Sequence, residues 1–431
     1  MVIRWLTCIV IPISILVGWL IINPLFADIS FRSFLKDGLE KAIHYTPENA
    51  WYHYLLGRFY ESDLKELNLK KAVESYREAL RLNPLDSRVW IVLARAYEGL
   101  GMEREADLSI SKAVIVNPNN SDLRWEAGNF YLLRKNADRA FQNLREYLLL
   151  KPGNQNMVYD LSERLASENR YILSNLIPPS YNYYKGYLSY LISNNKLVKA
   201  REVWNVISEG KEIEKGLYLK YIDFLISNSE YSEARKFWIS ALNYFGDIKN
   251  SEPLSGDAGS EDILWNGGFE KVPIDGGFDW KVGKAEGAKI FIDNDIHREG
   301  LKSLSIVFDG KHNPDLVAAS QVIILKPDTT YTLRGYIKTE NLTTTNGIFI
   351  DITGHNQAKG SCGKGLYKAT DTVTGTNHWK EVLADFRIPS DCYAGIISIK
   401  RQRSTKFDNK IGGSAWVDKI TIKEEERPYS R

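Results

Sequence analysis

Three prolines recur at a fixed spacing in the first half of the chain. Pro84, Pro118 and Pro152 each follow a run that reads as helix, and consecutive prolines lie 34 residues apart (118 − 84 and 152 − 118). Proline lacks a backbone N–H and its ring collides with the preceding helical turn, so a recurring proline marks a recurring helix end. A period of this size indicates stacked structural repeats that each close at a proline.

Other positions keep the same period. In the unit that ends at Pro118, large, packing and small residues fall at the expected places of the tetratricopeptide repeat pattern: Trp90, Leu93, Tyr97, Ala106 and Ala113. The preceding unit carries Gly57, Tyr60, Ala72 and Tyr76 around a three-residue insertion. The first half therefore resembles the tetratricopeptide repeat family. This resemblance implies a solenoid of helix pairs whose concave face binds a protein partner.

The pattern weakens after Pro152 but does not stop. Ala200 with Trp204 and Ala234 with Trp238 again stand 34 residues apart (234 − 200). We interpret "LVKAREVWNVI" and "YSEARKFWISAL" as second helices, preceded by first helices at "YNYYKGYLSYLI" and "GLYLKYIDFLI". The segment "SENRYILSNLIPPS" reads as irregular, so the number of units stays open. We expect the solenoid to occupy residues 28–247.

The first residues differ from the rest of the chain. After Arg4 an uncharged run extends from Trp5 to Ala27, and a bilayer span needs ~20 such residues. We expect an uncleaved signal anchor over residues 1–27, a single pass of the inner (cytoplasmic) membrane. Because Arg4 favours a cytoplasmic amino terminus, the body is expected in the periplasm or outside the cell. A signal peptide cleaved after Ala27 is the alternative.

Helical periodicity ends where Gly, Ser, Pro and Asp accumulate, and we interpret residues 248–262 as a linker. From 263 to 425, short segments rich in β-branched and aromatic residues alternate with turn signals, as in "KSLSIVFDG" and "SAWVDKITI". This pattern favours a β-sandwich.

Three motifs in this region resemble one known group of domains. "NGGFEKV", "LKPDTTYTLRGYIKTENL" and "SAWVDKITI" are similar to the galactose-binding-like jelly rolls of carbohydrate-binding modules, over Ile263 to Lys423. The resemblance implies sugar binding and a structural calcium ion held by Glu270 and Asp418. Carboxylate oxygens suit calcium; two solvated carboxylates at strand ends are the alternative. The expected fold is therefore multidomain α and β, with an N-terminal transmembrane helix, an α-solenoid of repeat helix pairs and a C-terminal jelly-roll β-sandwich.

Strand alternation selects candidate sugar-binding residues. Arg334 and Tyr336 share one side of a predicted strand, and Phe349, Asp351 and His355 share one side of the next. Aromatic rings stack on sugar C–H faces while polar groups bind hydroxyls, so we expect these five residues to form a carbohydrate-binding face. An ordinary solvated face is the alternative. Three tryptophans are expected in the core instead: Trp265, Trp280 and Trp416.

Two cysteines fall inside the predicted sandwich. Cys362 and Cys392 lie in "GSCGKG" and "SDCYAG", which read as loops or strand ends. In an oxidising compartment they can form a disulfide. They can equally be two unrelated small apolar residues, because sequence does not show whether their Cα atoms approach.

No sequence motif indicates catalysis or nucleic-acid binding. The 56 basic and 54 acidic residues leave a net charge of +2, without the basic clusters that nucleic-acid binding uses. The six histidines form no zinc-ligand pair, and C-x-x-C, Walker and dinucleotide-binding patterns are missing from the sequence. We therefore assign no catalytic or cofactor-binding residue and expect a protein that is not an enzyme.

These features predict a membrane-anchored extracytoplasmic protein that binds a protein partner through its helical repeats and a polysaccharide through its sandwich. The architecture resembles bacterial envelope proteins associated with exopolysaccharide or O-antigen synthesis and export, and this resemblance implies a role in polysaccharide synthesis, export or assembly. A polysaccharide-modifying or lytic enzyme with an unrecognised site is one alternative. A purely protein-binding envelope scaffold is the other.

Overall fold

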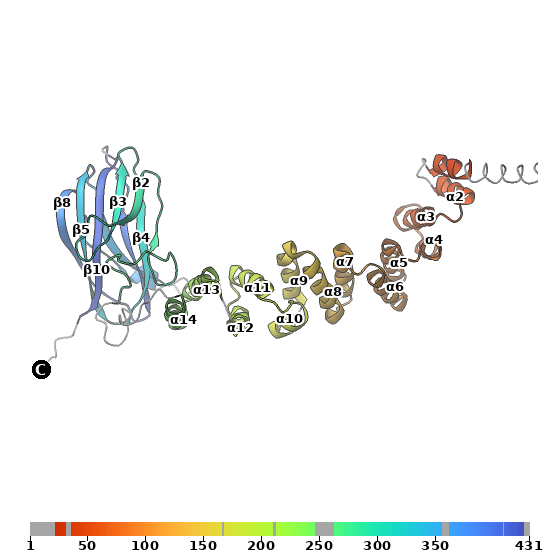
Figure 1. The fold of residues 1–431 in the computed structure, drawn as a ribbon, viewed down its shortest axis with the longest axis horizontal. Coiled ribbons are helices and arrows are strands. Elements are labelled where there is room, and N and C mark those ends of the chain that lie inside the picture. Colours follow the sequence, from red (N-terminus) through yellow and green to blue (C-terminus); the bar gives the residue numbers. More distant parts are fainter. Residues whose placement is uncertain are drawn as a thin grey trace, which may run out of the picture. The chain divides into compact units, whose positions relative to one another are not determined.

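The computed structural model describes residues 22–31, 36–165, 168–209, 213–245, 263–355, 362–407 and 409–425. The chain divides into two compact units, residues 1–194 with 198–207 and residues 195–197 with 208–431. The first unit contains helices α2 to α11 and nearly all of α12. The second contains α13, α14 and every described strand (Figure 1).

Helices in the repeat region form successive pairs joined by short turns. The bounds are α2 Lys36–Tyr45, α3 Ala50–Ser62, α4 Leu69–Leu82, α5 Ser87–Gly99, α6 Glu103–Val116, α7 Ser121–Leu133, α8 Ala137–Leu150, the short 3-10 helix η1 Pro152–Asn154, α9 Gln155–Leu165, α10 Asn169–Asn175, α11 Tyr181–Ser193, α12 Leu197–Ser208, α13 Lys215–Ser227 and α14 Tyr231–Tyr244. The predicted second helices of the last two units correspond to α12 and α14, which confirms that the array continues after Pro152.

Each of the spaced prolines stands in the turn after a second helix, as predicted. Pro84 and Pro118 follow α4 and α6, and Pro152 opens η1 after α8. Two residues after the first two prolines, the side chains of Asp86 and Asn120 accept backbone N–H groups of the next helix and cap it. Such an N-cap stabilises a helix by about 1 kcal/mol.

The turn proline also accepts a side-chain hydrogen bond. Trp90 Nε1 donates to the Pro84 carbonyl oxygen at 2.9 Å, and Arg124 Nε donates to the Pro118 oxygen at 3.0 Å. Both donors lie six positions after their proline. Arg124 thus stands where the preceding unit has Trp90, and it makes the same hydrogen bond to the proline carbonyl oxygen. The shared contact explains how the repeat accommodates an arginine at this position.

Small residues stand where paired helices approach closely. Ala72, Ala106 and Ala140 have no exposed surface, and Gly57 of α3 lies directly against the buried Tyr76 ring of α4. A Cβ atom at position 57 would overlap that ring. These observations confirm that the small positions of the repeat pattern face helix contacts.

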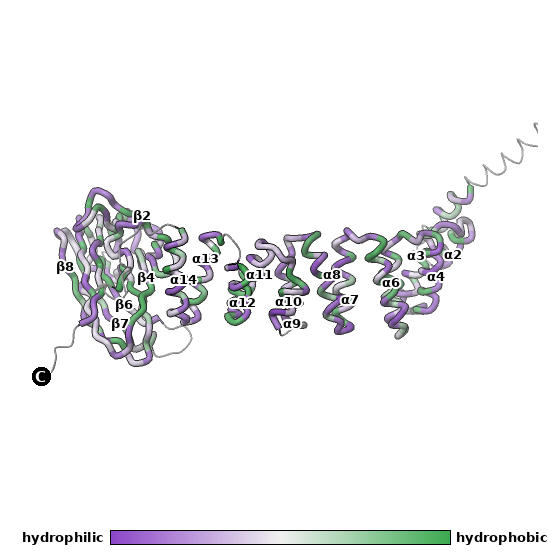
Figure 2. The backbone as a smooth tube through the Cα atoms, turned by 60° about the horizontal axis from the view of Figure 1, so that its bottom comes forward, coloured by the Kyte–Doolittle hydropathy of each residue, from purple (hydrophilic) through white to green (hydrophobic). Residues whose placement is uncertain are grey.

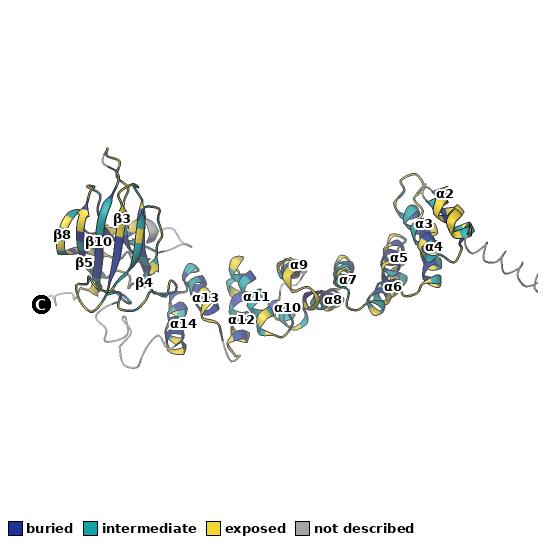
Figure 3. Ribbon diagram, turned by 45° about the horizontal axis from the view of Figure 1, so that its top comes forward, coloured by how far each residue is buried: buried dark blue, intermediate teal, exposed yellow. Residues whose placement is uncertain are grey.

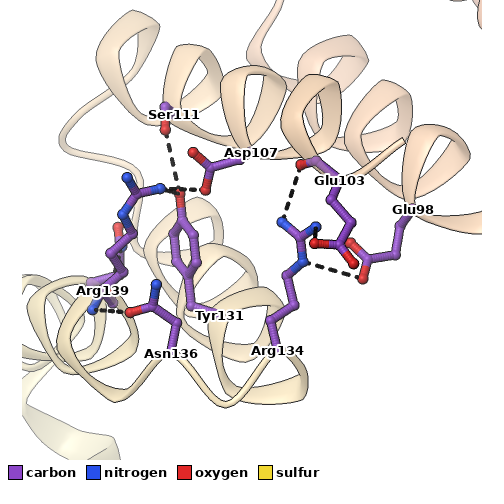
Figure 4. A network of polar contacts seen from close by, with 9 residues as sticks. Glu98, Glu103, Asp107, Ser111, Tyr131, Arg134, Asn136 and Arg139 are labelled. Carbon is purple, nitrogen blue, oxygen red and sulfur yellow. Dashed lines mark hydrogen bonds and ion pairs between the residues drawn. The ribbon is translucent and has the colours of Figure 1, made fainter. Parts of the chain in front are cut away.

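Polar contacts link the α5–α6 pair to the α7–α8 pair (Figure 4). Arg139 of α8 forms an ion pair with Asp107 of α6, and Arg134 lies 3.5 Å from carboxylate oxygens of both Glu98 and Glu103. Most of these side chains reach solvent, so each pair contributes at most about 1 kcal/mol. Apolar packing is therefore the larger source of stability between the pairs.

The less regular part of the array is helical as well. The segment that reads as irregular in sequence contains the short helix α10. Nearby, the rings of Tyr159, Tyr187 and Tyr190 pack with centroids 5.0 to 6.3 Å apart. The Tyr190 hydroxyl donates to Asp160 at 2.6 Å. A buried aromatic cluster therefore adds to the small-residue contacts in this part of the array, where Ala200 is fully buried as well.

None of the described helices combines the length and apolar character that a membrane crossing needs. Their hydrophobic and hydrophilic residues alternate (Figure 2), and buried and exposed positions occur together along them (Figure 3). The predicted span from Trp5 to Ala27 lies mostly outside the described residues, the first of which is residue 22.

The C-terminal part of the second unit is a sandwich of two five-stranded sheets. Its strands are β1 Lys281–Val282, β2 Ala288–Asp293, β3 Ser303–Asp309, β4 Leu316–Ile324, β5 Thr330–Leu342, β6 Phe349–Gly354, β7 Tyr367–Ala369, β8 Gly375–Arg387, β9 Ala394–Arg401 and β10 Gly412–Glu424, with a short helix α15, Cys362–Gly365. The sheet orders are β1-β4-β9-β6-β7 and β2-β3-β10-β5-β8, with antiparallel pairing. The predicted two-sheet sandwich is confirmed.

Side chains from both sheets fill the space between them. Leu333 and Ile337 of β5 meet Ile350 of β6 and Ile397 of β9 in one core, and all four are fully buried. Trp280 is also in this core, as predicted, and its Nε1 donates to the Asn266 carbonyl oxygen at 2.9 Å.

Cys362 and Cys392 form a disulfide, which resolves the alternatives left open by the sequence. Their Cα atoms lie 4.9 Å apart, within the usual range for a disulfide. The bond connects α15 to the turn before β9. It closes a 30-residue separation, which in the chain-entropy model stabilises the fold by about 3–4 kcal/mol.

The last helix pair belongs to the same compact unit as the sandwich. Trp238 of α14 packs against Trp265 and Phe278, with ring centroids 6.3 and 6.5 Å away. The predicted linker, residues 248–262, lies outside the described residues. The predicted boundary at 247 also lies outside the described residues and stays a prediction.

We expect Gly57→Ala to destabilise the repeat region by about 1–3 kcal/mol, because the added Cβ overlaps the Tyr76 ring, which is buried and has little room to move. Gly153→Ala is the matched control, since a Cβ there meets no atom within 4 Å. Urea unfolding of the full chain, followed by circular dichroism at the helix band, measures both variants. Equal midpoints for the two would contradict the assigned helix contact.

Candidate functional site

The five predicted sugar-binding residues do not form one face. Arg334 and Tyr336 lie on β5 of one sheet, whereas Phe349 and Asp351 lie on β6 of the other, with His355 directly after it. In each strand the neighbouring positions point into the core. The two groups therefore occupy opposite outer faces of the sandwich, and the structure corrects the expectation of a single shared face.

A row of polar residues crosses the outer face of the β1-β4-β9-β6-β7 sheet, which we call the polar face. The register pairs Lys281 with Ser320, Ser320 with Ser398, and Ser398 with Asp351, so the four residues follow one line across four strands. Of these, only Asp351 was selected from the sequence. The alternation in "SQVIIL" and "GIISIK" indicates on which side of its strand each serine lies. Only the strand order shows that Ser320 and Ser398 are neighbours.

The acidic end of this row is buried. Asp351 is 2% exposed; its Oδ2 accepts from Lys400 Nζ at 2.9 Å, and its Oδ1 has no hydrogen-bond partner among the described residues. Burial raises the pKa of Asp351, and the lysine opposes that shift. Phe349 lies on the same face and is 6% exposed, so it offers less ring surface than a stacking platform needs.

His355 stands at the other end of the polar face and contacts α14. The Tyr231 hydroxyl lies 2.7 Å from the His355 carbonyl oxygen and 2.8 Å from its ring Nδ1. Burial lowers the pKa of His355, which favours the neutral ring. The residue predicted to contact sugar therefore also connects the sandwich to the last helix pair.

The opposite outer face holds the other two predicted residues. Glu381 lies 3.2 Å from an Arg334 nitrogen and accepts from the Tyr336 hydroxyl at 2.8 Å. Trp416 lies on this face too, beneath Lys338, and is 6% exposed. Trp416 is therefore buried, but it does not lie between the two sheets as predicted. Its neighbours in β10, Ala415 and Val417, point into the core instead.

The two predicted calcium ligands stabilise one loop. Asp418 Oδ2 accepts backbone N–H groups of residues 298 and 299 at 2.6 and 3.0 Å, and Glu270 Oε1 accepts those of residues 301 and 302 at 2.9 and 3.1 Å. Burial, followed by the nearby Glu270 charge, raises the pKa of Asp418 despite these hydrogen bonds. The loop 298–302 thus brings two like charges close together.

This arrangement fits a hard cation. Glu270 Oε2 accepts no hydrogen bond from the described residues, and a positive ion would offset the repulsion between the carboxylates. No third Asp, Glu, His or Cys joins the pair in the described part of the chain. The remaining ligands of a calcium ion would therefore be backbone carbonyl oxygens or water.

A groove of ≈ 330 Å³ lies in the repeat region, between the second helices α4 and α6, with α5 as its third wall. Trp90, Tyr97 and the half-exposed Leu108 supply apolar surface, and Arg77 and Glu105 add charge. Most of its lining comes from second helices. The groove has room for a partner's side chains.

The sandwich matches a family model described as a carbohydrate binding domain, over residues 261–406. This match confirms the resemblance of the C-terminal domain to carbohydrate-binding modules. For the N-terminal half, the observed helix pairs with their 34-residue proline period support the repeat assignment.

Among curated proteins, the tRNA(Glu)-specific nuclease WapA of Bacillus subtilis subsp. natto (strain BEST195) is 28% identical over 187 residues, which cover 42% of this chain and 8% of that protein. Similar solved structures include Pseudomonas aeruginosa pilF, 17% identical with a TM-score of 0.28 over 52% of this chain and 95% of that one. A family 16 carbohydrate binding module is 19% identical with a TM-score of 0.25 over 37% and 99%.

We expect the stability of the sandwich to fall as pH rises from about 4 to about 6. Burial raises the pKa of Asp279 to about 6, above the ~3.9 of an unfolded chain, so between these values the folded state binds more protons than the unfolded state. The loss from this group is at most about 3 kcal/mol.

Asp279→Asn should flatten this pH dependence, because it removes the titrating group while keeping an acceptor for the backbone N–H of Ile274. The exposed Asp385→Asn is the control and should retain the slope. Urea unfolding of the full chain at several pH values, followed by tryptophan fluorescence, measures how the free energy of unfolding depends on pH. An unchanged slope in Asp279→Asn would assign the dependence to other groups.

Proposed function

We propose that this chain binds a glycan through the polar face of its sandwich and a protein partner through its repeat array, in polysaccharide synthesis, export or assembly. The match of residues 261–406 to a carbohydrate binding domain carries the glycan half of the proposal. The exposed Lys281 and the half-buried Ser320 of the polar face support it chemically, because such groups form hydrogen bonds with sugar hydroxyls.

Two charged residues on opposite sheets allow a matched test of this binding. Lys400 and Arg334 each pair with a carboxylate, Asp351 on the polar face and Glu381 on the other. If the polar face binds glycan, Lys400→Gln should weaken binding about tenfold or more, since a hydrogen bond to a charged group is lost. Arg334→Gln should bind as the wild type does.

A glycan array probed with the purified full chain, followed by calorimetry on the strongest hit, makes this measurement. If only Arg334→Gln weakens binding, the site lies on the opposite face. If the wild-type chain binds none of the arrayed glycans, the glycan half of the proposal is wrong.

We also propose that Glu270 and Asp418 bind a structural calcium ion. Binding to the folded state alone raises the melting temperature with ligand concentration. Calcium should therefore raise the melting temperature of the sandwich transition, and Glu270→Gln should remove most of that increase. The isosteric change keeps an acceptor for the loop N–H groups, so the loop itself should persist. Identical melting curves in calcium and in chelator would contradict the site.

We further propose that the chain is anchored in the inner membrane by residues 1–27, with its body outside the cytoplasm. The disulfide between Cys362 and Cys392 supports this location, because disulfides persist in oxidising compartments. Under this proposal the groove between α4 and α6 faces the envelope and is available to a protein partner.

A single labelling experiment tests the location and the partner. Leu108→Cys places a thiol in the groove, and Leu133→Cys places one at an exposed position outside it. A membrane-impermeant maleimide photocrosslinker, added to intact cells or spheroplasts, should label both variants more than the wild type. Irradiation should then capture a partner through position 108 alone. No labelling would contradict the location, and equal capture at both positions would contradict the groove.

A further inference from the structure

The last helix pair is fixed to the sandwich by contacts of three kinds. Asp223 of α13 accepts from Gly277 N at 2.9 Å and from Lys281 Nζ at 3.1 Å. The Tyr231 hydroxyl at the start of α14 binds His355, and Trp238 further along α14 packs on Trp265 and Phe278. An ion pair, a buried polar contact and aromatic packing therefore define one arrangement of the pair on the sandwich.

A cavity of ≈ 230 Å³ lies between this helix pair and the polar face. The helices contribute Asp223, Ile226 and Ser227, and the sandwich contributes further lining that includes Lys281, Ser320, Val322, His355 and Ile396. Its volume is below the ~300–1,000 Å³ of a site for a drug-sized ligand. The cavity is therefore suited to a small group, such as one sugar ring.

Several polar side-chain atoms in this cavity form no hydrogen bond with the described residues. Asp223 Oδ1 accepts both of the side-chain hydrogen bonds of this residue, and within the described ranges Oδ2 accepts none. Among the described residues, Ser320 Oγ and His355 Nε2 likewise make no hydrogen bond. The cavity thus presents a carboxylate oxygen, a hydroxyl and a ring nitrogen to whatever enters it.

The hydrogen bonds of Tyr231 define the role of the free ring nitrogen. A tyrosine hydroxyl has one proton, and the His355 carbonyl oxygen can only accept it. The hydroxyl therefore donates its proton to the carbonyl oxygen. His355 Nδ1 lies 2.8 Å from the same hydroxyl, so it carries a proton and donates it to the hydroxyl oxygen. In the neutral ring Nε2 is then an acceptor. With Asp223 Oδ2 it forms a pair of acceptors, which matches the hydroxyl donors of a sugar.

We propose that this cavity binds a single sugar ring of a glycan, and that the last helix pair of the repeat array is therefore part of the glycan site. The inference rests on the proposed glycan binding. It adds Asp223, Ile226 and Ser227, which lie outside the matched domain of residues 261–406. The apolar side chains Val322 and Ile396 face the ring, and the polar atoms bind its hydroxyls.

A second pocket of ≈ 270 Å³ shares His355 with this cavity, and the α13–α14 turn, the start of α14, Ile324, Leu325 and Tyr393 line it. Along the polar face, by contrast, Ser398 and Asp351 are each 2% exposed. A glycan that extends beyond the cavity would therefore continue into the second pocket rather than over these two residues.

Polysaccharide isolated from the source cells is the probe, and calorimetry with the wild-type chain measures its binding. If the wild-type chain does not bind this probe, both this inference and the proposed glycan binding are overturned.

Two variants test the helix contribution. Asp223→Asn exchanges an acceptor for an amide of the same shape, and Ile396→Trp fills the cavity from the sheet; each should weaken binding about tenfold or more. Leu383→Trp, at an exposed position on the opposite sheet, is the control and should bind normally. Thermal melting checks that each variant folds. Wild-type affinity in both folded cavity variants would exclude the helix pair from the site, even if the glycan binds elsewhere on the sandwich.

Discussion

A stacked array of helix pairs buries each apolar face against the next pair, so the final pair needs a different cover. In this chain the sandwich provides it. Trp238 and Tyr231 of α14 are 4% and 8% exposed although no repeat follows them, and their partners are Trp265, Phe278 and His355. The requirement that the last pair be covered thus makes α13 and α14 a structural part of the β domain, and the candidate site depends on it.

Polar contacts hold the last helix pair on the sandwich and leave open space between them. Asp223 accepts from Gly277 N, and the Tyr231 hydroxyl donates to the His355 carbonyl oxygen, which fixes the helices against the sandwich without filling every gap. The gap that remains lies over the serines of the polar face. A cavity there has rigid walls, because one side is a sheet and the other is a helix anchored at two points. Rigid walls lower the ordering cost of binding a small group.

A disulfide and a pair of carboxylates, rather than the hydrogen bonds of the sheets, stabilise two loops of the sandwich. The disulfide connects α15 to the turn before β9, and the carboxylates of Glu270 and Asp418 take four backbone N–H groups of loop 298–302. The disulfide makes the domain sensitive to reducing agents, a condition that differs between the cytoplasm and the cell exterior.

Local periodicity in the sequence was sufficient to predict several elements of this fold. A helix must end at each spaced proline because the ring and the missing N–H act within one turn, so the helix pairs, their small contact positions and the array's continuation through Trp238 were predictable. The β-rich composition likewise predicted a sandwich, and its motifs pointed to Glu270 and Asp418. The sheet that each strand joins, in contrast, became known only from the folded structure. Tyr336 and Asp351 lie on alternating positions of neighbouring strands in sequence, yet on opposite faces of the molecule, because the connection between β5 and β6 crosses from one sheet to the other. For the same reason the disulfide, the row of Ser320 and Ser398, and the placement of Asp223 beside Lys281 depend on long-range pairing, which side-chain periodicity does not encode.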